Sequence, residues 1–142
     1  MRVPYETMLA EFERVLKKYG FSPERAHEAA EIFAQNSLAG VFSHGLNRFP
    51  RVVEYLRKGE IDPAAEAVCT ASFGAMERWD GQRGFGPLNA RHAIAADVAA
   101  SEPAEPDREV RCPGMGEHRS RKENMELGIP VAEEKWAEVL AM

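Results

Sequence analysis

The stretch SPERAHEAAEIFAQNSLAG, residues 22–40, predicts the helix around which the rest of the fold is organised. Ser22 is a favourable N-cap, and Pro23 suits the first helical position, where no backbone donor is needed. Apolar residues then recur at helical spacing and define one inward face: Ala26, Ala29, Ala30, Phe33, Ala34 and Leu38. Because most of these side chains are small, we expect a neighbouring helix to approach closely.

Helices are also predicted on both sides of this stretch. The preceding helix should end at a Gly20 cap. Its apolar positions are Met8, Leu9, Phe12, Val15, Leu16 and Tyr19. The following helix should begin near Asn47, because Pro50 is tolerated only in a first turn, and it should end at Gly59. Its buried positions are Phe49, Val52, Val53 and Leu56.

The pattern changes at Val68. Small or apolar residues alternate with polar ones from there, and Asp80-Gly81 is a strong signal for a hairpin turn. Pro87 then opens a helix over residues 87–100. The sequence therefore predicts a β-hairpin followed by a helix.

The C-terminal part follows a stretch with linker composition, SEPAEPDRE. A charged surface helix closed by Gly128 comes next, and a last short helix should bury Trp136, Val139 and Leu140. The predicted fold is mostly α with a small β-hairpin, in the α+β class. It divides into a helical segment with a candidate site (1–66), a hairpin and helix (67–100), a linker (101–109) and a C-terminal helical segment (110–142).

The bulk composition sets limits on partners and location. The chain has 142 residues and a formal net charge of −5, so no nucleic-acid partner is expected, because such proteins present a basic surface. Residues 1–18 carry acids and no continuous apolar run, so neither a signal peptide nor a membrane anchor is expected. Cys69 and Cys112 lie far apart without further ligands at metal spacing, which indicates reduced thiols in a cytoplasmic protein and no metal site.

Residues 40–56, GVFSHGLNRFPRVVEYL, hold more reactive side chains than a connection between helices needs. A histidine that titrates near neutrality can donate a proton to the alkoxide formed when a 2-oxo acid is reduced. Arginine binds a carboxylate in a planar, bidentate geometry. His44 and Arg48 offer these roles about one helical turn apart, with Ser43 just ahead. Spacing alone favours the simpler interpretation, in which His44 caps the helix and Arg48 is a solvated charge.

Other groups of residues favour structural roles. Gly81, Gly84 and Gly86 precede a helix, where backbone amides can hold a phosphate. However, their order is not that of a dinucleotide-binding loop and no βαβ unit surrounds them, so a turn leading into the helix is favoured. Cys69 has no nearby histidine and is not expected to act as a nucleophile. Charged, solvated helix faces are predicted for His27, His92 and His118.

Taken whole, GVFSHGLNRFPRVVEYLRKGEIDP, residues 40–63, closely resembles the N-terminal motif of the malate/L-lactate dehydrogenase family that does not use a Rossmann fold. The stretch AMERWDGQRGFGPLNARHAI, residues 75–94, resembles the hairpin and helix that follow this motif. The stretch REVRCPGMGEHRSRKENMELGIPVAEEKWAEVL, residues 108–140, is similar to the family's C-terminal segment. The resemblance implies one helical domain built from both ends of the chain.

The resemblance also implies a chemistry. In this family the histidine that matches His44 is the proposed proton donor, and the arginine that matches Arg48 helps to hold the substrate, a small 2-oxo acid. The cofactor is NAD(H) or NADP(H), and the turn that matches Gly114, Met115 and Gly116 touches it in relatives. In this chain the residues after the PG turn depart from the family's pattern.

Family members carry a large central domain between these two ends, and this sequence passes from one end to the other without it. Two interpretations follow. The chain is a shortened oxidoreductase, completed by another chain, or it is a non-catalytic remnant that acts as a helical dimerisation module. Because that domain supplies most of the cofactor pocket, the isolated chain is not expected to bind the cofactor or to be active. The hairpin would face the central domain, so an exposed apolar patch and a homodimer are expected.

Overall fold

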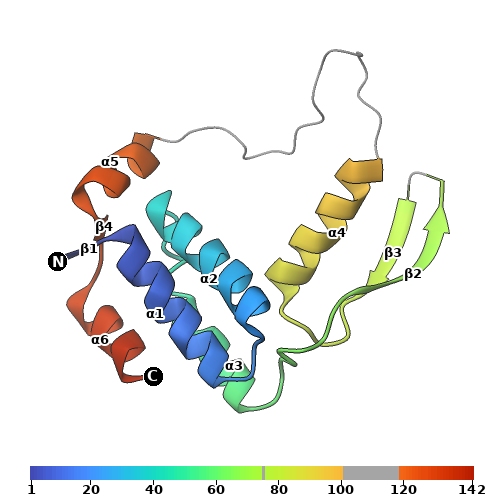
Figure 1. Cartoon of the computed structure of the whole chain (residues 1–142), viewed down its shortest axis with the longest axis horizontal. Helices are drawn as coiled ribbons and strands as arrows, with labels where there is room; N and C mark the ends of the chain where they lie inside the picture. Colours follow the sequence, from blue (N-terminus) through green and yellow to red (C-terminus); the bar gives the residue numbers. More distant parts are fainter. Residues whose placement is uncertain (75, 101–118) are drawn as a thin grey trace.

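A computed structural model of the chain describes residues 1–74, 76–100 and 119–142. Over these residues the chain forms six helices and four short strands. In chain order they are β1 (Arg2–Val3), α1 (Tyr5–Lys18), α2 (Pro23–Leu38), α3 (Phe49–Arg57), β2 (Val68–Phe73), β3 (Met76–Asp80), α4 (Gly86–Ala100), α5 (Arg119–Leu127), β4 (Ile129–Pro130) and α6 (Glu133–Ala141). Helices α1 to α3 group at the centre, with α5 and α6 on one side and α4 with the β2–β3 hairpin on the other (Figure 1). The predicted class, mostly α with a small hairpin, is confirmed.

The predicted inward face of α2 is the centre of the core. All of its predicted residues are buried, and the Oγ of Ser22 accepts a hydrogen bond from the Arg25 amide at 3.3 Å, as expected of an N-cap. Helix α1 packs along this face and ends before Gly20, whose φ is +94°. It buries Met8, Phe12, Val15 and Leu16. The alanines of α2 therefore allow the close helix–helix approach that the sequence predicts.

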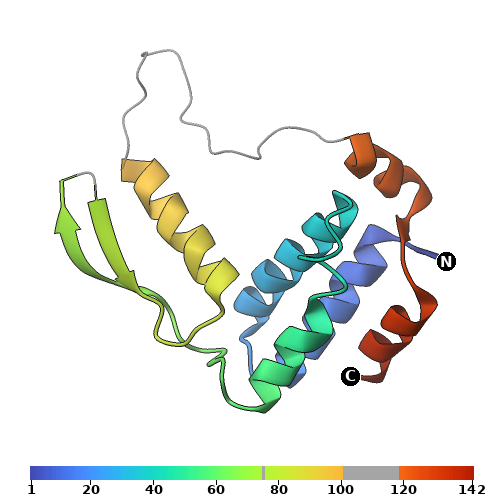
Figure 2. The ribbon, with the colours of Figure 1, turned by 180° about the vertical axis from the view of Figure 1, so that it is seen from behind.

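Phenylalanine rings join the three central helices to the chain just before α4. Phe12 of α1 stacks on Phe49 of α3 with ring centroids 4.2 Å apart, and Phe33 of α2 meets Phe49 edge-on at 5.1 Å. Phe33 also stacks on Phe85 at 5.4 Å. Helix α3 packs on the back of α1 and α2 as they are seen in Figure 1, and it lies in front of them in Figure 2.

Helix α3 begins at Phe49 rather than near Asn47. The preceding residues are held in consecutive turns, so the regular helix starts only after them. Pro50 still lies in the first turn, as predicted, and Gly59 follows the helix with a φ of +70°. Phe49, Val52 and Val53 are buried, whereas Leu56 is half-buried at the edge of the core.

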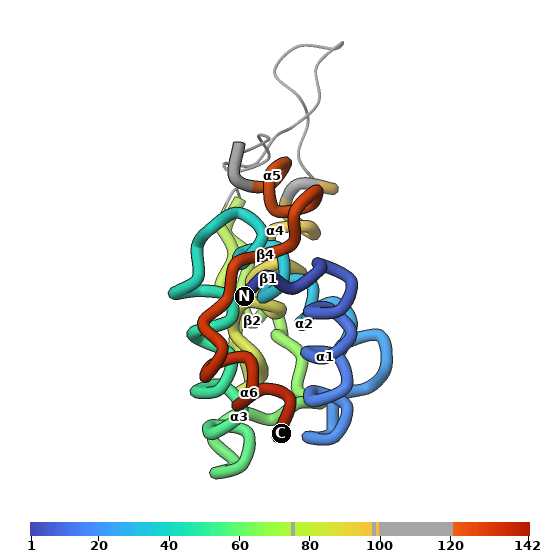
Figure 3. Tube along the Cα trace, turned by 90° about the vertical axis from the view of Figure 1, so that its left-hand side faces the viewer, coloured from blue at the N-terminus to red at the C-terminus, as the bar shows by residue number. Residues whose placement is uncertain are grey.

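The C-terminal segment packs against the N-terminal end of the chain. Strand β4 pairs antiparallel with β1, Val3 lying opposite Ile129, and the Arg2 guanidinium donates to the Gly128 carbonyl at 2.8 Å. Figure 3 shows this pairing at one end of the molecule and α6 beside α1 and α3. Trp136 and Val139 are buried as predicted, but the prediction for Leu140 is wrong. Its side chain is 50% exposed because it lies on the outer face of α6.

The hairpin forms, but its predicted turn is wrong. Strands β2 and β3 pair antiparallel with Phe73 opposite Met76, so the hairpin reverses at Gly74 and not at Asp80-Gly81. Asp80-Gly81 instead marks another turn, which leads the chain from β3 into α4. There the Gly84 amide donates to the Gly81 carbonyl at 2.7 Å. The central residues of that turn, Gln82 and Arg83, have φ values of 51° and 60°.

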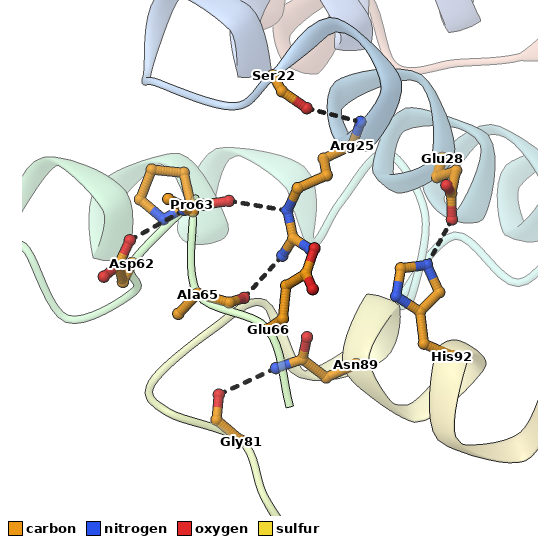
Figure 4. Close-up of polar contacts among 11 residues, drawn as sticks. Ser22, Arg25, Glu28, Asp62, Pro63, Ala65, Glu66, Gly81, Asn89 and His92 are labelled. Atoms are coloured by element: carbon orange, nitrogen blue, oxygen red, sulfur yellow. Dashed lines mark hydrogen bonds and ion pairs between the residues drawn. The ribbon is translucent and has the colours of Figure 1, made fainter. Parts of the chain in front are cut away.

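Polar contacts fasten α2 to the loop before β2 and to α4 (Figure 4). Arg25 is 8% exposed, and its side chain donates to the Pro63 and Ala65 carbonyls at 3.1 and 2.7 Å and to the Glu66 carboxylate at 3.2 Å. Further along α2, Glu28 lies 2.7 Å from the Nε2 of His92 on α4. None of the helices in the described part of the chain has the length and apolarity that crossing a bilayer requires.

Candidate active site

The candidate site lies on the tight turns that connect α2 to α3. The Gly45 amide donates to the Val41 carbonyl at 3.1 Å, and the Asn47 amide donates to the Phe42 carbonyl at 3.1 Å. The Arg48 amide then donates to the Gly45 carbonyl at 3.0 Å, and Arg48 is the N-cap of α3. We call residues 42–48 the His44 turn. The prediction that His44 lies in the connection leading into the third helix is confirmed.

The side chains of Ser43 and His44 meet at the surface of the His44 turn, and the Arg48 side chain contacts the backbone of the same turn. The Ser43 hydroxyl lies 3.1 Å from the Nδ1 of His44, and the Nε of Arg48 donates to the Ser43 carbonyl at 3.4 Å. All three residues are exposed. The Ser43 contact occupies Nδ1 of the imidazole, and the Arg48 contact is to a neutral carbonyl. The Arg48 guanidinium has no carboxylate within salt-bridge distance in the described part of the chain.

The middle of the turn is buried although its reactive side chains are exposed. Leu46 is 1% exposed, and its amide donates to the Ser37 hydroxyl of α2 at 2.9 Å. A Cβ at Gly45 would collide with the same hydroxyl, so only glycine allows the turn to lie this close to α2. The sequence analysis missed Ser37 and this role of Gly45. The available signal was a serine at the end of an otherwise apolar helix face.

Two hollows on the surface lie apart from the predicted site residues His44 and Arg48. One, of about 470 Å³, lies between α3 and α6 and is lined partly by Asn47, Arg51 and Lys135. Neither His44 nor Arg48 lines it. The other, of about 310 Å³, lies beside the turn into α4 and is lined by Gly81, Gly84 and Gly86 among others. His44 and Arg48 are exposed and line neither of these two hollows.

Gly81 and Gly84 use their backbone groups within the turn that leads into α4. The Gly81 carbonyl accepts both the Gly84 amide and the side-chain amide of Asn89, the latter at 3.0 Å. At Gly84 a Cβ would lie 2.5 Å from the Ala65 carbonyl and 2.6 Å from the Asn89 nitrogen. These contacts support the predicted turn leading into a helix.

The remaining predicted residues take no part in the His44 turn. His27 is exposed and lies 3.2 Å from Glu13, whereas His92 is half-buried against Glu28 rather than fully solvated. Hydrogen bonds from Lys17 and then His27 lower the pKa of Glu13, and the hydrogen bond with His92 lowers the pKa of Glu28. Cys69 is a free, exposed thiol, and no group of metal-ligating residues occurs within the ranges described. Five predicted positions lie outside the described residues: Cys112, Gly114, Met115, Gly116 and His118.

Comparison with known proteins assigns the family. Residues 3–99 match the family model described as malate/L-lactate dehydrogenase, so the chain belongs to this family. The matched region contains the whole His44 turn, the hairpin and almost all of α4. The resemblance predicted from the SHGLNRFP motif is thereby confirmed. The predicted similarity of residues 108–140 to the family's C-terminal segment lies outside this match and stays a prediction.

The relatives agree with this assignment. The 2,3-diketo-L-gulonate reductase of Escherichia fergusonii is 46% identical over 102 residues, which cover 70% of this chain and 31% of the relative. Among solved structures, the sulfolactate dehydrogenase from Methanocaldococcus jannaschii matches with a TM-score of 0.66 at 29% identity. The matched region covers 70% of this chain and 29% of the dehydrogenase chain. The malate dehydrogenase from Pyrococcus horikoshii has a TM-score of 0.66 at 25% identity, with 70% and 28% covered. The match thus spans about a third of the length of the curated relatives.

Proposed function

We propose that this chain carries the substrate-binding and proton-donating portion of an NAD(P)H-dependent 2-oxo-acid reductase of the 2,3-diketo-L-gulonate reductase type. The observation that supports it is the placement of Ser43, His44 and Arg48 on one exposed turn, inside the region that matches the family. Arg48 would hold the substrate carboxylate through its guanidinium. His44 would give a proton to the oxygen of the 2-oxo group, and the product would be a 2-hydroxy acid.

The nicotinamide cofactor of such a reaction supplies the hydride. The described residues do not fit it, because His44 and Arg48 are exposed and line neither of the two hollows described above. Hydride transfer needs the reacting atoms held about 3–3.5 Å apart. We therefore assign no step to the cofactor in this chain, and expect neither NADH nor NADPH to bind it alone. A reduced thiol at Cys69 supports a cytoplasmic location.

Carboxylate binding tests the role of Arg48. In an NMR titration with pyruvate or 2,3-diketogulonate, the amide signals of residues 43–48 should shift, with weak affinity, because an exposed ion pair contributes only about 0–1 kcal/mol. Arg48→Ala should abolish the shifts. Arg51→Ala is the matched control, since Arg51 is also exposed on α3 and bonds instead to the Tyr55 hydroxyl. Equal loss in both variants would show nonspecific attraction of anions.

Turnover assays test whether the isolated chain is a complete enzyme. The isolated chain with NADH or NADPH and a 2-oxo acid should show no reduction. Reduction that disappears in both His44→Ala and Arg48→Ala would show that the chain is a complete enzyme. Reduction that persists in both variants would identify a contaminating enzyme.

A second candidate function is a helical dimerisation module without catalytic activity. Exposed apolar residues of the hairpin and α4 favour it: Val68 is 52% exposed, Phe73 66%, Met76 70% and Ile94 53%. A homodimer would cover this surface. Sedimentation at high micromolar concentration should detect a dimer, and Phe73→Ser with Met76→Ser should dissociate it. Leu140→Ser is the control, because Leu140 is exposed on α6 away from the hairpin. A strict monomer in the unmodified chain would refute this function.

A further inference from the structure

Ser37 connects the core of α2 to the His44 turn. Its side chain is fully buried, donates to the Phe33 carbonyl at 2.9 Å and accepts the Leu46 amide at 2.9 Å. The other hydrogen bonds that the backbone amides of residues 42–48 donate within the described chain end on the carbonyls of Val41, Phe42 or Gly45. The Ser37 hydroxyl is therefore the contact through which α2 holds the backbone of this turn.

Close packing at Gly45 strengthens the connection. Besides the collision with the Ser37 hydroxyl, a Cβ there would lie 2.8 Å from the Ser37 amide nitrogen and 3.0 Å from the Phe33 carbonyl oxygen. The turn thus lies against the last turn of α2 on one side, with Leu46 inserted into the core. A shift of Leu46 moves the residues on either side of it, and these include His44 and Arg48.

We propose that Ser37 is a positioning residue of the candidate site: by holding the Leu46 amide, its hydroxyl sets the placement of Ser43, His44 and Arg48 within the turn. The physical reason is the asymmetry of a buried hydrogen bond. Without the hydroxyl, the Leu46 amide would be buried without a partner, which is unfavourable, so the turn would move until that amide reached water or another acceptor. The proposal deepens the function proposed above, because it concerns how the same side chains are placed.

A matched pair of variants isolates the hydroxyl. Ser37→Thr and Ser37→Val add the same bulk to the buried site, and only the threonine keeps the hydroxyl. The Leu46 amide should exchange with deuterium about tenfold faster in Ser37→Val than in Ser37→Thr, the change that loss of one such bond implies. Nuclear Overhauser contacts between the His44 ring and Ser43 should weaken in Ser37→Val only. Exchange of the core amides of α1 should be the same in both, which separates movement of the turn from general destabilisation.

A second comparison avoids overpacking, since Ser37→Ala removes the hydroxyl without adding bulk. It should reproduce the fast Leu46 exchange against the unmodified chain. Equal Leu46 exchange with and without the hydroxyl would overturn the proposal. So would fast exchange that leaves the His44–Ser43 contacts unchanged, because Ser37 would then be structural only. These measurements need no substrate, so failure of the unmodified chain to bind a 2-oxo acid would count against the proposed function and not against the positioning role.

Discussion

The helical body, made of α1, α2, α3 and α6, and the arm, made of β2, β3 and α4, differ in how their apolar residues are used. In the body the predicted faces meet each other, and Phe12, Phe33 and Phe49 form one buried cluster. In the arm, Phe73 and Met76 are 66% and 70% exposed. Within the described residues, the arm reaches the core through Phe85, just before α4, and Leu88 in the first turn of that helix.

The contrast between body and arm shows what an apolar pattern in the sequence specifies. Periodicity indicates which side chains favour burial, but it does not name the surface that covers them. The body supplies that surface from within the described chain. A two-stranded hairpin is only marginally stable by itself in water, and every residue of β2 and β3 except Ala71 and Trp79 is exposed. The arm is therefore the region whose environment in the working protein is still to be found.

The largest expected effect is the loss of the body itself. Removing residues 107–142 takes away β4 and α6, which pair with β1 and bury Trp136 and Val139. Because neither end of the chain buries enough apolar surface alone, the shortened chain should lose cooperative unfolding, as followed by circular dichroism during heating. A sharp melt of that chain would show that the two ends do not share one core.

A pair of phenylalanine substitutions compares the two regions directly. Phe12→Ala should cost about 3–5 kcal/mol in the free energy of unfolding, because it empties a ring-stacked position in the core. Phe73→Ala should change it by less than about 0.5 kcal/mol, as is usual for an exposed position. Urea unfolding of both variants measures the contrast, and Phe12→Leu serves where the alanine variant does not fold. Equal costs would mean that the hairpin is covered in solution.

The turn within the arm that leads from β3 into α4 should respond to glycine. Arg83 has a φ of 60°, a conformation that disfavours side chains. Arg83→Gly should therefore be about 1 kcal/mol more stable than Arg83→Ala, since alanine keeps the backbone penalty while removing the same side chain. Thermal unfolding of the two variants tests this. A glycine variant that is no more stable than the alanine variant would show that the turn relaxes at no cost.

The smallest expected effect is the acid dependence of the α2–α4 contact. The hydrogen bond with His92 lowers the pKa of Glu28 from its ordinary value of 4.5. A carboxyl whose pKa is lowered by folding stabilises the fold above its unfolded pKa, and this contribution is lost as the pH falls through the folded pKa. His92→Ala should therefore flatten the decline in stability below pH 4.5, by less than about 1 kcal/mol for so exposed a pair.

The matched histidine variant is His27→Ala. Lys17 is the larger cause of the lowered pKa of Glu13 and stays in place in that variant. The acid limb of its stability curve should therefore change less than that of His92→Ala. Unfolding free energies measured between pH 3 and pH 6 by urea titration compare the two. A larger change in His27→Ala would contradict the assignment.

Local patterns predicted the body well, because its helices carry both their own caps and their own partners. Ser22, Pro23 and Gly20 mark helix ends through backbone chemistry that acts within a few residues. The hairpin turn is predicted at Asp80-Gly81 instead of at Gly74 because both turns contain residues with positive φ. The sequence does not show which of the two turns joins the paired strands. Leu140 was expected inside because helical spacing allows two adjacent faces in so short a helix.

The candidate site was predictable in its reactive residues and not in its support. His44 and Arg48 stand out by chemical type and spacing. Ser37 does not, because a serine on a helix face is ordinary until the structure shows the Leu46 amide above it. Gly45 likewise has no unusual φ to mark it, and its reason is the nearness of α2.

The pairing of β1 with β4 joins the first residues of the chain to its C-terminal segment, and we call this pairing the clasp. After the arm, which ends with α4, the chain continues at α5 and returns to the body through β4, where the Met1 amine lies 3.4 Å from the Val131 carbonyl. Lengthening a closed loop is inexpensive, at about 0.6 kcal/mol for each doubling. A lineage can thus enlarge or shorten whatever sequence stands between Ala100 and Arg119 without redesigning the clasp. The segment between Ala100 and Arg119 can therefore change in evolution while the helical body keeps His44 and Arg48 in place.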